Sequence, residues 1–268
     1  MRALSFNSHV SYGSVGHNVT MFSAQEYEVA LTAIHTVNFS NHPGYGNFFG
    51  EWISEEVLEA QINMLDKIGV LSHHDAILSG YLGKVETINI IEKVVKKLKL
   101  EEKIEYFLDP VMGDSDKGLY VSSEIAQGIK ERLLPLADFI MPNVFELEYL
   151  TGETLNSVAE IKNGCRKLLE KYSLQGILVT SVENLEKIGI LYISKTECFE
   201  SYSEKFHFDF IPRGSGDYIS ALFMANKILG EKNEKVVEKL SSIIYNSFKL
   251  TYEKKEKELF LYSEKRSK

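Results

Sequence analysis

The chain has 268 residues, of which 44% are hydrophobic and 25% are charged, as in ordinary globular proteins and unlike disordered or fibrous ones. Its length suits one large α/β domain. Thirty basic residues against 38 acidic ones give a net charge of −8, which repels phosphate backbones and anionic lipid and so disfavours binding to nucleic acid or to a membrane surface.

Short apolar runs alternate along the chain with helical stripes, which is the pattern of βα units. Several runs are apolar throughout, as in strands that are covered on both faces of a parallel sheet. In chain order the predicted strands are residues 3–6, 30–34, 76–78, 106–108, 139–141 and 177–180, with 259–262 as a final edge strand. The pattern predicts an α/β fold with a central, mostly parallel sheet and helices on both faces.

The clearest helical stripe covers residues 85–98, where apolar side chains share one side and Glu and Lys the other. Further helices are predicted at 55–67, 123–132, 158–171 and 218–229, and from 234 into the mid-240s. The Lys- and Glu-rich segment after Lys249 is expected to be a solvated helix face or tail. No repeat or Pro/Gly-rich linker interrupts the pattern, so we expect a single domain over residues 1–268.

The cellular setting follows from two features of the sequence. Cys165 and Cys198 have no disulfide-like or metal-binding spacing, which fits a reducing compartment. Residues 1–6 are too short an apolar run for a signal peptide, and no stretch approaches 18 uninterrupted apolar residues. We therefore expect a cytoplasmic protein that is not associated with a membrane.

Small polar residues and glycines follow one predicted strand after another, in segments 7–9, 79–81, 109–110, 142–143 and 180–181. Such residues also form ordinary turns. However, ligands of open parallel sheets bind at the carboxyl ends of the strands, and a series of polar segments in those places favours a binding site.

The sharpest motif is Gly214-Ser215-Gly216-Asp217, which precedes a predicted helix. Its glycines let the backbone turn N–H groups toward one point, and the helix adds the positive end of its dipole, so we expect an anion there. Asp217 either caps the helix or acts as a base. Phosphoryl transfer needs fixed donors for the moving group and a carboxylate that accepts the proton of the attacking hydroxyl. Arg213 either adds a cation over that group or is an ordinary surface residue.

Carboxylates follow two further strands, at Asp109, Asp114 and Glu146. They suit Mg²⁺, which keeps most of its waters and takes one or two protein oxygens together with nucleotide phosphates. Each acid also has a structural explanation as a helix cap, and Glu146 stands at capping-box spacing from Asn143. Both interpretations remain open at this point.

Segment 38–50 combines glycines with aromatic residues, as does a lid that covers a flat heteroaromatic ligand and excludes water. Its glycines miss the dinucleotide-binding spacing by one residue, and no GxxxxGK[ST] motif occurs, which disfavours a Rossmann cofactor and a P-loop kinase. The histidines lack metal-binding spacing. We expect structural roles for His9 and His42.

In their order along the chain, these motifs resemble those of the pyridoxal kinases of the ribokinase-like superfamily. The motifs are Asn7-Ser8-His9-Val10, Asn38-Phe39-Ser40-Asn41-His42, Ser79-Gly80-Tyr81-Leu82-Gly83, Asp109-Pro110-Val111-Met112-Gly113-Asp114, Pro142-Asn143-Val144-Phe145-Glu146 and Gly214-Ser215-Gly216-Asp217. The second and third set the chain closer to this branch than to the hydroxymethylpyrimidine kinases.

The resemblance implies ATP-dependent phosphorylation of the 5′-hydroxymethyl group of pyridoxal, and of pyridoxine and pyridoxamine, in vitamin B6 salvage. It makes Asp217 the catalytic base and Gly214, Ser215 and Gly216 the anion hole. The implied vitamin-binding residues are Ser8, Pro43, Gly44, Tyr81 and Asp217, under a lid over residues 37–50. The implied ATP-binding residues are Asp109, Asn143, Glu146, Thr180, Ser181, Arg213, Gly214 and Gly216, with Mg²⁺ on Asp109, Asp114 and Glu146. The family is typically a homodimer and often stimulated by a monovalent cation such as K⁺.

The chain departs from the family pattern at three places. Ser215 stands where many relatives carry Thr and keeps the hydroxyl. Pro43 stands where relatives often have a hydrogen-bonding Thr, so we expect one polar contact to the substrate to be missing. Residues 182–213 match no family pattern and leave the adenine contacts unassigned. Two alternatives stay open: a hydroxymethylpyrimidine or sugar kinase on the same scaffold, and a non-catalytic vitamin-binding protein.

Overall fold

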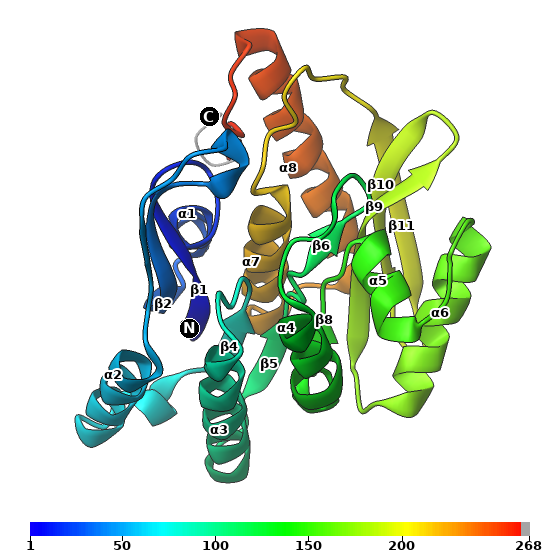
Figure 1. Cartoon of the computed structure of the whole chain (residues 1–268). Helices are drawn as coiled ribbons and strands as arrows, with labels where there is room; N and C mark the ends of the chain where they lie inside the picture. Colours follow the sequence, from blue (N-terminus) through cyan, green and yellow to red (C-terminus); the bar gives the residue numbers. More distant parts are fainter. Residues whose placement is uncertain (264–268) are drawn as a thin grey trace.

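The structure, a computed structural model, describes residues 1–263 and is built on a nine-stranded sheet (Figure 1). The order across this sheet is β11-β10-β9-β8-β5-β4-β1-β2-β3. The strands are β1 (Arg2–Tyr12), β2 (Ala30–Asn41), β3 (Gly50–Trp52), β4 (Ala76–Ser79), β5 (Glu105–Leu108), β8 (Phe139–Ile140), β9 (Gly176–Asn184), β10 (Lys187–Ile193) and β11 (Cys198–Glu204), and a separate pair is formed by β6 (Gly113–Asp114) and β7 (Gly118–Leu119). The strands from β9 to β2 are parallel, whereas β3, β10 and β11 pair antiparallel at the edges. The prediction of a mostly parallel sheet is confirmed.

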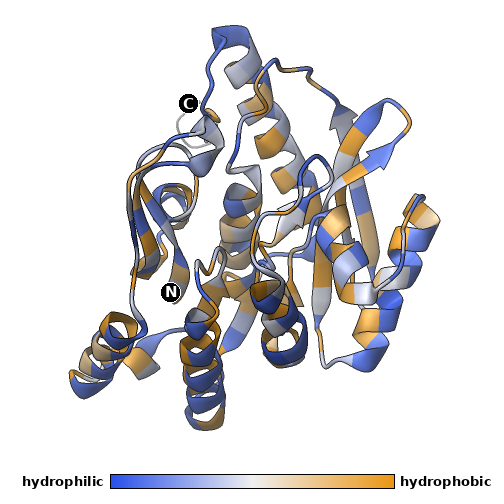
Figure 2. Cartoon of the chain, in the orientation of Figure 1, coloured by the Kyte–Doolittle hydropathy of each residue, from blue (hydrophilic) through white to orange (hydrophobic). Residues whose placement is uncertain are grey.

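Helices cover both faces of the sheet, as predicted (Figure 1). They are α1 (His17–Glu26), α2 (Glu55–Lys67), α3 (Glu86–Glu101), α4 (Ser123–Gly128), α5 (Val144–Thr151), α6 (Val158–Lys171), α7 (Ser215–Ile228) and α8 (Asn233–Lys254), with short turns η1 (Pro43–Tyr45), η2 (Leu71–His73), η3 (Ile129–Leu133) and η4 (Leu134–Leu136). Apolar residues of α2 to α6 form one core cluster, and those of α1, α7 and α8 form another. Figure 2 shows hydrophobic and hydrophilic residues alternating along α2 and α3, so each of these helices has one apolar side. Within residues 1–263, no helix combines the length and apolarity that crossing a bilayer requires.

Serine caps explain why two helices begin where they were predicted. The Ser54 side chain accepts from the Val57 N–H at the start of α2, and the Ser157 side chain accepts from the Glu160 N–H at the start of α6. The predicted helix 123–132 is instead split, because α4 ends at Gly128 and the chain continues in the wider turn η3. The charged segment after Lys249 is helical as far as Lys254, and residues 264–268 lie outside the described part.

Strand bounds differ from the prediction near both ends of the chain. β1 and β2 continue to Tyr12 and Asn41, so segments 7–9 and 38–41 lie inside strands rather than after them. The predicted edge strand 259–262 is wrong. There the Phe260 N–H bonds to Thr251 Oγ1, at 2.8 Å, and the Tyr262 N–H bonds to Ser247 Oγ, at 3.1 Å, so these amides pair with side chains of α8 and not with a strand.

The strand order marks where a ligand should bind. The chain passes from β1 to β2 on one side and later returns to β4 on the other side of β1. Open α/β sheets bind ligands outside the carboxyl ends of the strands at such a switch point. The carboxyl end of β4 leads directly into Gly80 and Tyr81.

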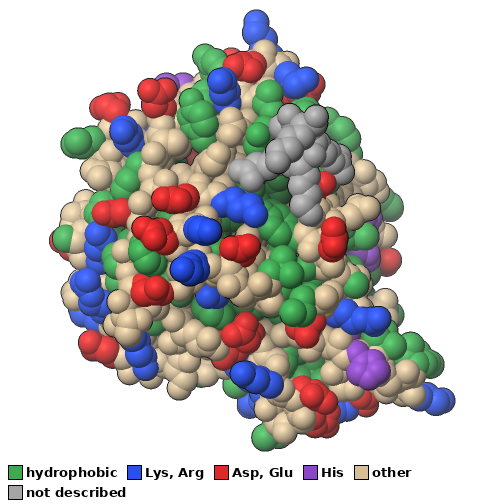
Figure 3. Space-filling view, turned by 180° about the vertical axis from the view of Figure 1, so that it is seen from behind, with side chains coloured by type: hydrophobic (Ala, Val, Ile, Leu, Met, Phe, Trp, Pro, Cys, Tyr) green, Lys and Arg blue, Asp and Glu red, His purple; other side chains and the backbone are tan. Residues whose placement is uncertain are grey.

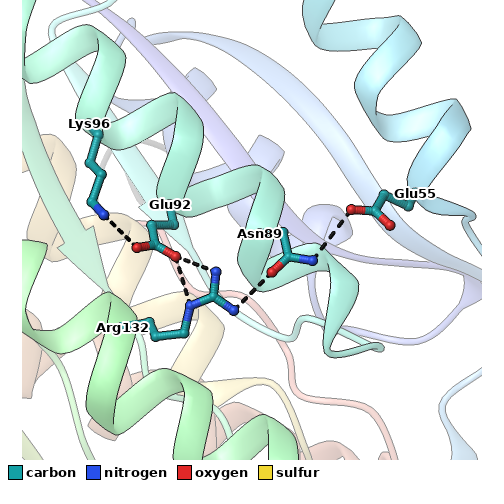
Figure 4. Close-up of polar contacts among 5 residues, drawn as sticks. All are labelled: Glu55, Asn89, Glu92, Lys96 and Arg132. Atoms are coloured by element: carbon teal, nitrogen blue, oxygen red, sulfur yellow. Dashed lines mark hydrogen bonds and ion pairs between the residues drawn. The ribbon is translucent and has the colours of Figure 1, made fainter.

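A polar network joins α2 and α3, which flank β4 in the chain, to the turn η3 (Figure 4). Arg132 of η3 donates to Glu92 and Asn89 of α3. Glu92 also accepts from Lys96, and Asn89 donates to Glu55 of α2. Partly exposed pairs contribute little stability one by one, and together these contacts connect α2, α3 and η3.

Candidate active site

Asp217 lies in the first turn of α7, beside β1. Its carboxylate accepts hydrogen bonds from the Asn7 side-chain amide, at 2.8 Å, and from the Gly16 backbone N–H, at 2.9 Å. Burial raises the pKa of Asp217, while these two donors lower it. The side chain is thus a fixed carboxylate with an elevated pKa, which suits a general base.

Gly214 precedes α7 with a left-handed φ of 95°. A Cβ at this position would lie 1.6 Å from the carbonyl oxygen of Ser14, so only glycine fits. A Cβ at Gly216 would meet nothing within 4 Å. The opening N–H groups of a helix have no partner within it and carry the positive end of its dipole. The loop therefore presents donors to an open space, as an anion site requires.

Asn7 connects the parts of this site, whereas the sequence pattern placed it only among the polar residues of segment 7–9. It is 2% exposed and donates to Asp217, while its amide oxygen accepts from the N–H groups of Ser8, at 2.8 Å, and Tyr81, at 3.0 Å. A Cβ at Gly80 would lie 2.7 Å from Asn7 Nδ2. An amide side chain is needed here because it donates to a carboxylate and accepts from two amides at once.

Besides Asp217, the predicted vitamin-binding residues fall into two groups. Ser8 and Tyr81 both bond to Asn7, and a Cβ at Gly16 would lie 2.3 Å from the Ser8 hydroxyl. Pro43 and Gly44 lie in turn η1. A cavity of about 370 Å³ has Tyr81 in its wall, together with Trp52 and Tyr120. As far as residues 1–263 define that cavity, Ser8, Pro43 and Gly44 do not line it.

Asp109 is a buried carboxylate at the end of β5. It accepts from the Ser220 hydroxyl of α7 at 2.8 Å. Burial raises the pKa of Asp109, and the charges of Glu146 and Asp217 raise it further. The structure thus brings together three acids from separate parts of the chain.

Glu146 completes the capping box that its spacing predicts. Its N–H donates to the Asn143 side chain at 2.8 Å, and its carboxylate accepts from the Asn143 N–H at 2.9 Å and the Met112 N–H at 3.0 Å. Burial raises the pKa of Glu146 to about 8, despite these N–H donors. The structural interpretation of Glu146 is confirmed, and Asn143 also donates to the Gly113 carbonyl at 2.8 Å.

The predicted Mg²⁺ ligands differ in how well they could bind the ion. Asp114 is engaged by Arg213, at 2.8 Å, and by the Lys117 N–H, at 3.0 Å, and both Glu146 oxygens bond to backbone N–H groups. No three His, Cys, Asp or Glu side chains within residues 1–263 form a ready metal cage. Hydrated Mg²⁺ needs only one or two carboxylates besides phosphate. Asp109, buried and repelled by neighbouring acids, fits that need best of the three.

Thr180 and Ser181 lie in β9, and Thr180 forms a parallel bridge with Asn143. Ser181 has a φ of 56°, a strained value for a serine of the kind that often occurs at functional sites. Of the predicted nucleotide-binding residues, Asp109 follows β5, Asn143 and Glu146 follow β8, and Thr180 and Ser181 lie in β9.

The two histidines singled out in the sequence have different surroundings. His42 caps η1, with its Nδ1 accepting the Gly44 N–H at 2.9 Å, so its contact is structural. His9 stacks on His35 with ring centroids 4.6 Å apart. Among residues 1–263, no group hydrogen-bonds to the buried Nδ1 of His9.

This chain is similar in sequence and in structure to known kinases. The family model described as phosphomethylpyrimidine kinase matches residues 19–259. The pyridoxal kinase PdxY of Corynebacterium diphtheriae is 33% identical over 264 residues, and that of Leifsonia xyli is 34% identical over 269 residues. Each alignment covers 97% of this chain and 93% of the relative. The solved structure of the Entamoeba histolytica pyridoxal kinase with PLP superposes with a TM-score of 0.85 at 26% identity, covering 92% of this chain and 88% of the other.

Proposed function

The chain belongs to the phosphomethylpyrimidine kinase family and its curated relatives are pyridoxal kinases, so we propose that it transfers the γ-phosphoryl group of ATP to the 5′-hydroxymethyl group of pyridoxal. Pyridoxine and pyridoxamine carry the same primary alcohol and are included. The product is pyridoxal 5′-phosphate, which places the enzyme in vitamin B6 salvage. The observation that carries the proposal is the Asp217 carboxylate, held by Asn7 and Gly16 beside the loop that begins α7.

In this mechanism Asp217 accepts the proton of the attacking alcohol as the alcohol oxygen bonds to phosphorus and ADP leaves. The elevated pKa of Asp217 makes it a stronger base than an exposed aspartate, while hydrogen bonds from Asn7 and Gly16 keep it in place. The opening amides of α7 stabilise the oxygens of the migrating group, because they are oriented before the reaction begins.

The two substrates bind beside residues of different strands. Ser8 and Tyr81, which bond to Asn7, and turn η1 form the vitamin side of the site. Asn143, Thr180 and Ser181 provide the nucleotide side, with the Gly214 loop between the two. Arg213 contributes a cation close to this loop while it pairs with Asp114 at 2.8 Å.

Asp109 is the residue that we propose to hold Mg²⁺, with Glu146 and Asp114 in the surrounding acidic group. The ion would neutralise charge on the phosphates of ATP. A cation also offsets the mutual repulsion of Asp109, Glu146 and Asp217. Stimulation by a monovalent cation such as K⁺ is proposed from the family resemblance alone.

We propose that the enzyme is a single-domain cytoplasmic homodimer. One nine-stranded sheet supports a single kinase domain over residues 1–268. On the face seen in Figure 3, Lys and Arg side chains are interspersed with Asp and Glu rather than gathered into a basic patch, which argues against nucleic-acid binding there. The unpaired Cys165 and Cys198 support a cytoplasmic location. A homodimer is proposed from the resemblance.

The test compares turnover of pyridoxal, hydroxymethylpyrimidine and ribose at equal Mg·ATP, with pyridoxal phosphate formation followed spectrophotometrically. We expect pyridoxal to have the highest kcat/KM. Faster turnover of hydroxymethylpyrimidine or ribose would assign the chain to another branch of the scaffold. Pyridoxal binding without phosphate transfer would make it a vitamin-binding protein.

A further inference from the structure

Glu258 connects three segments that are far apart in the sequence. Its carboxylate accepts hydrogen bonds from the Ser14 backbone N–H, at 2.6 Å, and from the Tyr45 hydroxyl. Ser14 lies between β1 and α1, Tyr45 ends η1, and Glu258 follows α8. Figure 1 shows the segment after α8 returning to the connection between β2 and β3.

The segment that carries Glu258 is anchored next to it. Leu259 is 2% exposed, and the Phe260 N–H donates to Thr251 Oγ1 at 2.8 Å. The carboxylate is therefore held at a fixed point on α8 and its core cluster, and its two donors are fixed relative to that point.

One carboxylate oxygen fixes the loop that positions the base. Ser14 lies two residues before Gly16, whose N–H donates to Asp217 at 2.9 Å. The Ser14 carbonyl oxygen also packs so closely on Gly214 that a Cβ there would lie 1.6 Å away. A shift of the Ser14 peptide would therefore move both the donor to Asp217 and the start of the anion loop.

The other carboxylate oxygen fixes turn η1. The Tyr45 ring packs near Phe210 and Tyr12, with centroid distances of 5.6 and 6.0 Å. The bond to Glu258 therefore holds a ring between β1 and the segment that leads into the Gly214 loop. The same turn contains Pro43 and Gly44, which we assign to the vitamin side of the site.

We propose that Glu258 is a positioning residue that couples turn η1 to the loop holding Asp217, so that closure over the vitamin and placement of the base depend on one carboxylate. The role rests on the proposed kinase function. Glu258 acts through Tyr45 and Ser14. A carboxylate suits this role because hydrogen bonds to a charged acceptor are stronger than bonds to a neutral one.

The kinetic test uses variants that remove one contact or both. Tyr45→Phe loses only the hydroxyl bond and should raise KM for pyridoxal by about tenfold, with kcat near that of the wild type. Glu258→Ala loses both bonds and should also lower kcat by about tenfold. Glu258→Gln keeps one acceptor oxygen and should recover part of the loss. Glu256→Ala, which removes an exposed glutamate from the same segment, is the matched control and should behave as the wild type.

Hydrogen exchange of the full chain without ligands gives a readout that does not depend on turnover. Glu258→Ala should speed exchange in peptides covering 13–17 and 42–46, with β4 and β5 unchanged. Wild-type exchange in both peptides, or wild-type kinetics in Glu258→Ala, would overturn the proposal. If Glu258→Ala does not fold, a wild-type KM in Tyr45→Phe overturns it instead. If the wild-type chain forms no pyridoxal phosphate while Glu258→Ala still speeds exchange, the proposed function fails and the coupling stands.

Discussion

Replacing Asn7 with alanine removes one of the two donors that hold the Asp217 carboxylate. The bond is 2.8 Å long and Asn7 is 2% exposed. A hydrogen bond to a charged group contributes about 1.5–3 kcal/mol. Because this bond lowers the pKa of Asp217, its loss should raise that pKa further.

Asp217 accepts a proton only when it is ionised, so the acid limb of the kcat/KM profile should move to higher pH. Pyridoxal phosphate formation measured across acidic and neutral pH follows the limb directly. KM for pyridoxal should rise as well, because the Ser8 and Tyr81 amides lose their acceptor. Asn226→Ala is the matched control: this buried asparagine of α7 donates to the Leu222 carbonyl at 2.7 Å, and its loss should lower Tm without moving the limb.

An acid limb that stays at the wild-type pH in a folded Asn7→Ala variant would show that Asn7 does not set the pKa of the catalytic base. A limb displaced to lower pH would contradict the direction of the effect. Either result would remove Asn7 from the proposed mechanism.

Three further changes follow from the same geometry. Gly214→Ala places a Cβ 1.6 Å from the Ser14 carbonyl oxygen at a φ of 95°. Thermal unfolding should therefore show a free energy of unfolding lower by about 1–3 kcal/mol, and turnover should fall. A variant with wild-type Tm and kcat would contradict this packing. The pKa of Glu146 is about 8 in the folded chain, against an ordinary 4.5, so between these two pH values the folded chain binds more protons than the unfolded chain. The free energy of unfolding should therefore decrease as the pH rises through that interval. Glu146→Gln should flatten this dependence in denaturant unfolding, and an unchanged slope would speak against a raised pKa. Chelation of divalent cations should abolish pyridoxal phosphate formation and excess Mg²⁺ should restore it, whereas turnover that survives chelation would exclude the proposed Mg²⁺ role.

The location of the site could be predicted from the sequence because parallel strands end at a common edge. The polar segments after β4, β5 and β8 meet there without any need for accurate strand bounds. Gly214 was also interpretable alone, since a glycine pair before a helical stripe indicates a left-handed residue and free amides. These signals are local, so a single sequence contains them.

Pairs of distant residues could not be predicted in the same way. Asn7 and Asp217 are 210 positions apart, and Ser220 and Asp109 are 111 apart. The sequence shows that each side chain can donate or accept, but only the packing of α7 against the sheet selects the partners. The coupling through Glu258 is hidden for the same reason.

Several elements were missed, and for α1 and the β10–β11 hairpin the reason is an unusual burial pattern. α1 places His17, Thr20 and Ser23 in the core, where their side chains find hydrogen-bond partners, so the helix shows no apolar stripe. The β10–β11 hairpin is buried mainly at the far end of β10 and leaves β11 largely exposed or half-buried. For this reason the hydrophobic residues of the hairpin show no clear strand periodicity.

The most direct measurement is the steady-state kcat of Asp217→Ala with pyridoxal and Mg·ATP. If the carboxylate beside the α7 amides takes the proton of the alcohol, kcat should fall by roughly 10²-fold or more, with a smaller change in KM for pyridoxal. A folded variant that keeps a kcat close to that of the wild type would show that another group accepts the proton.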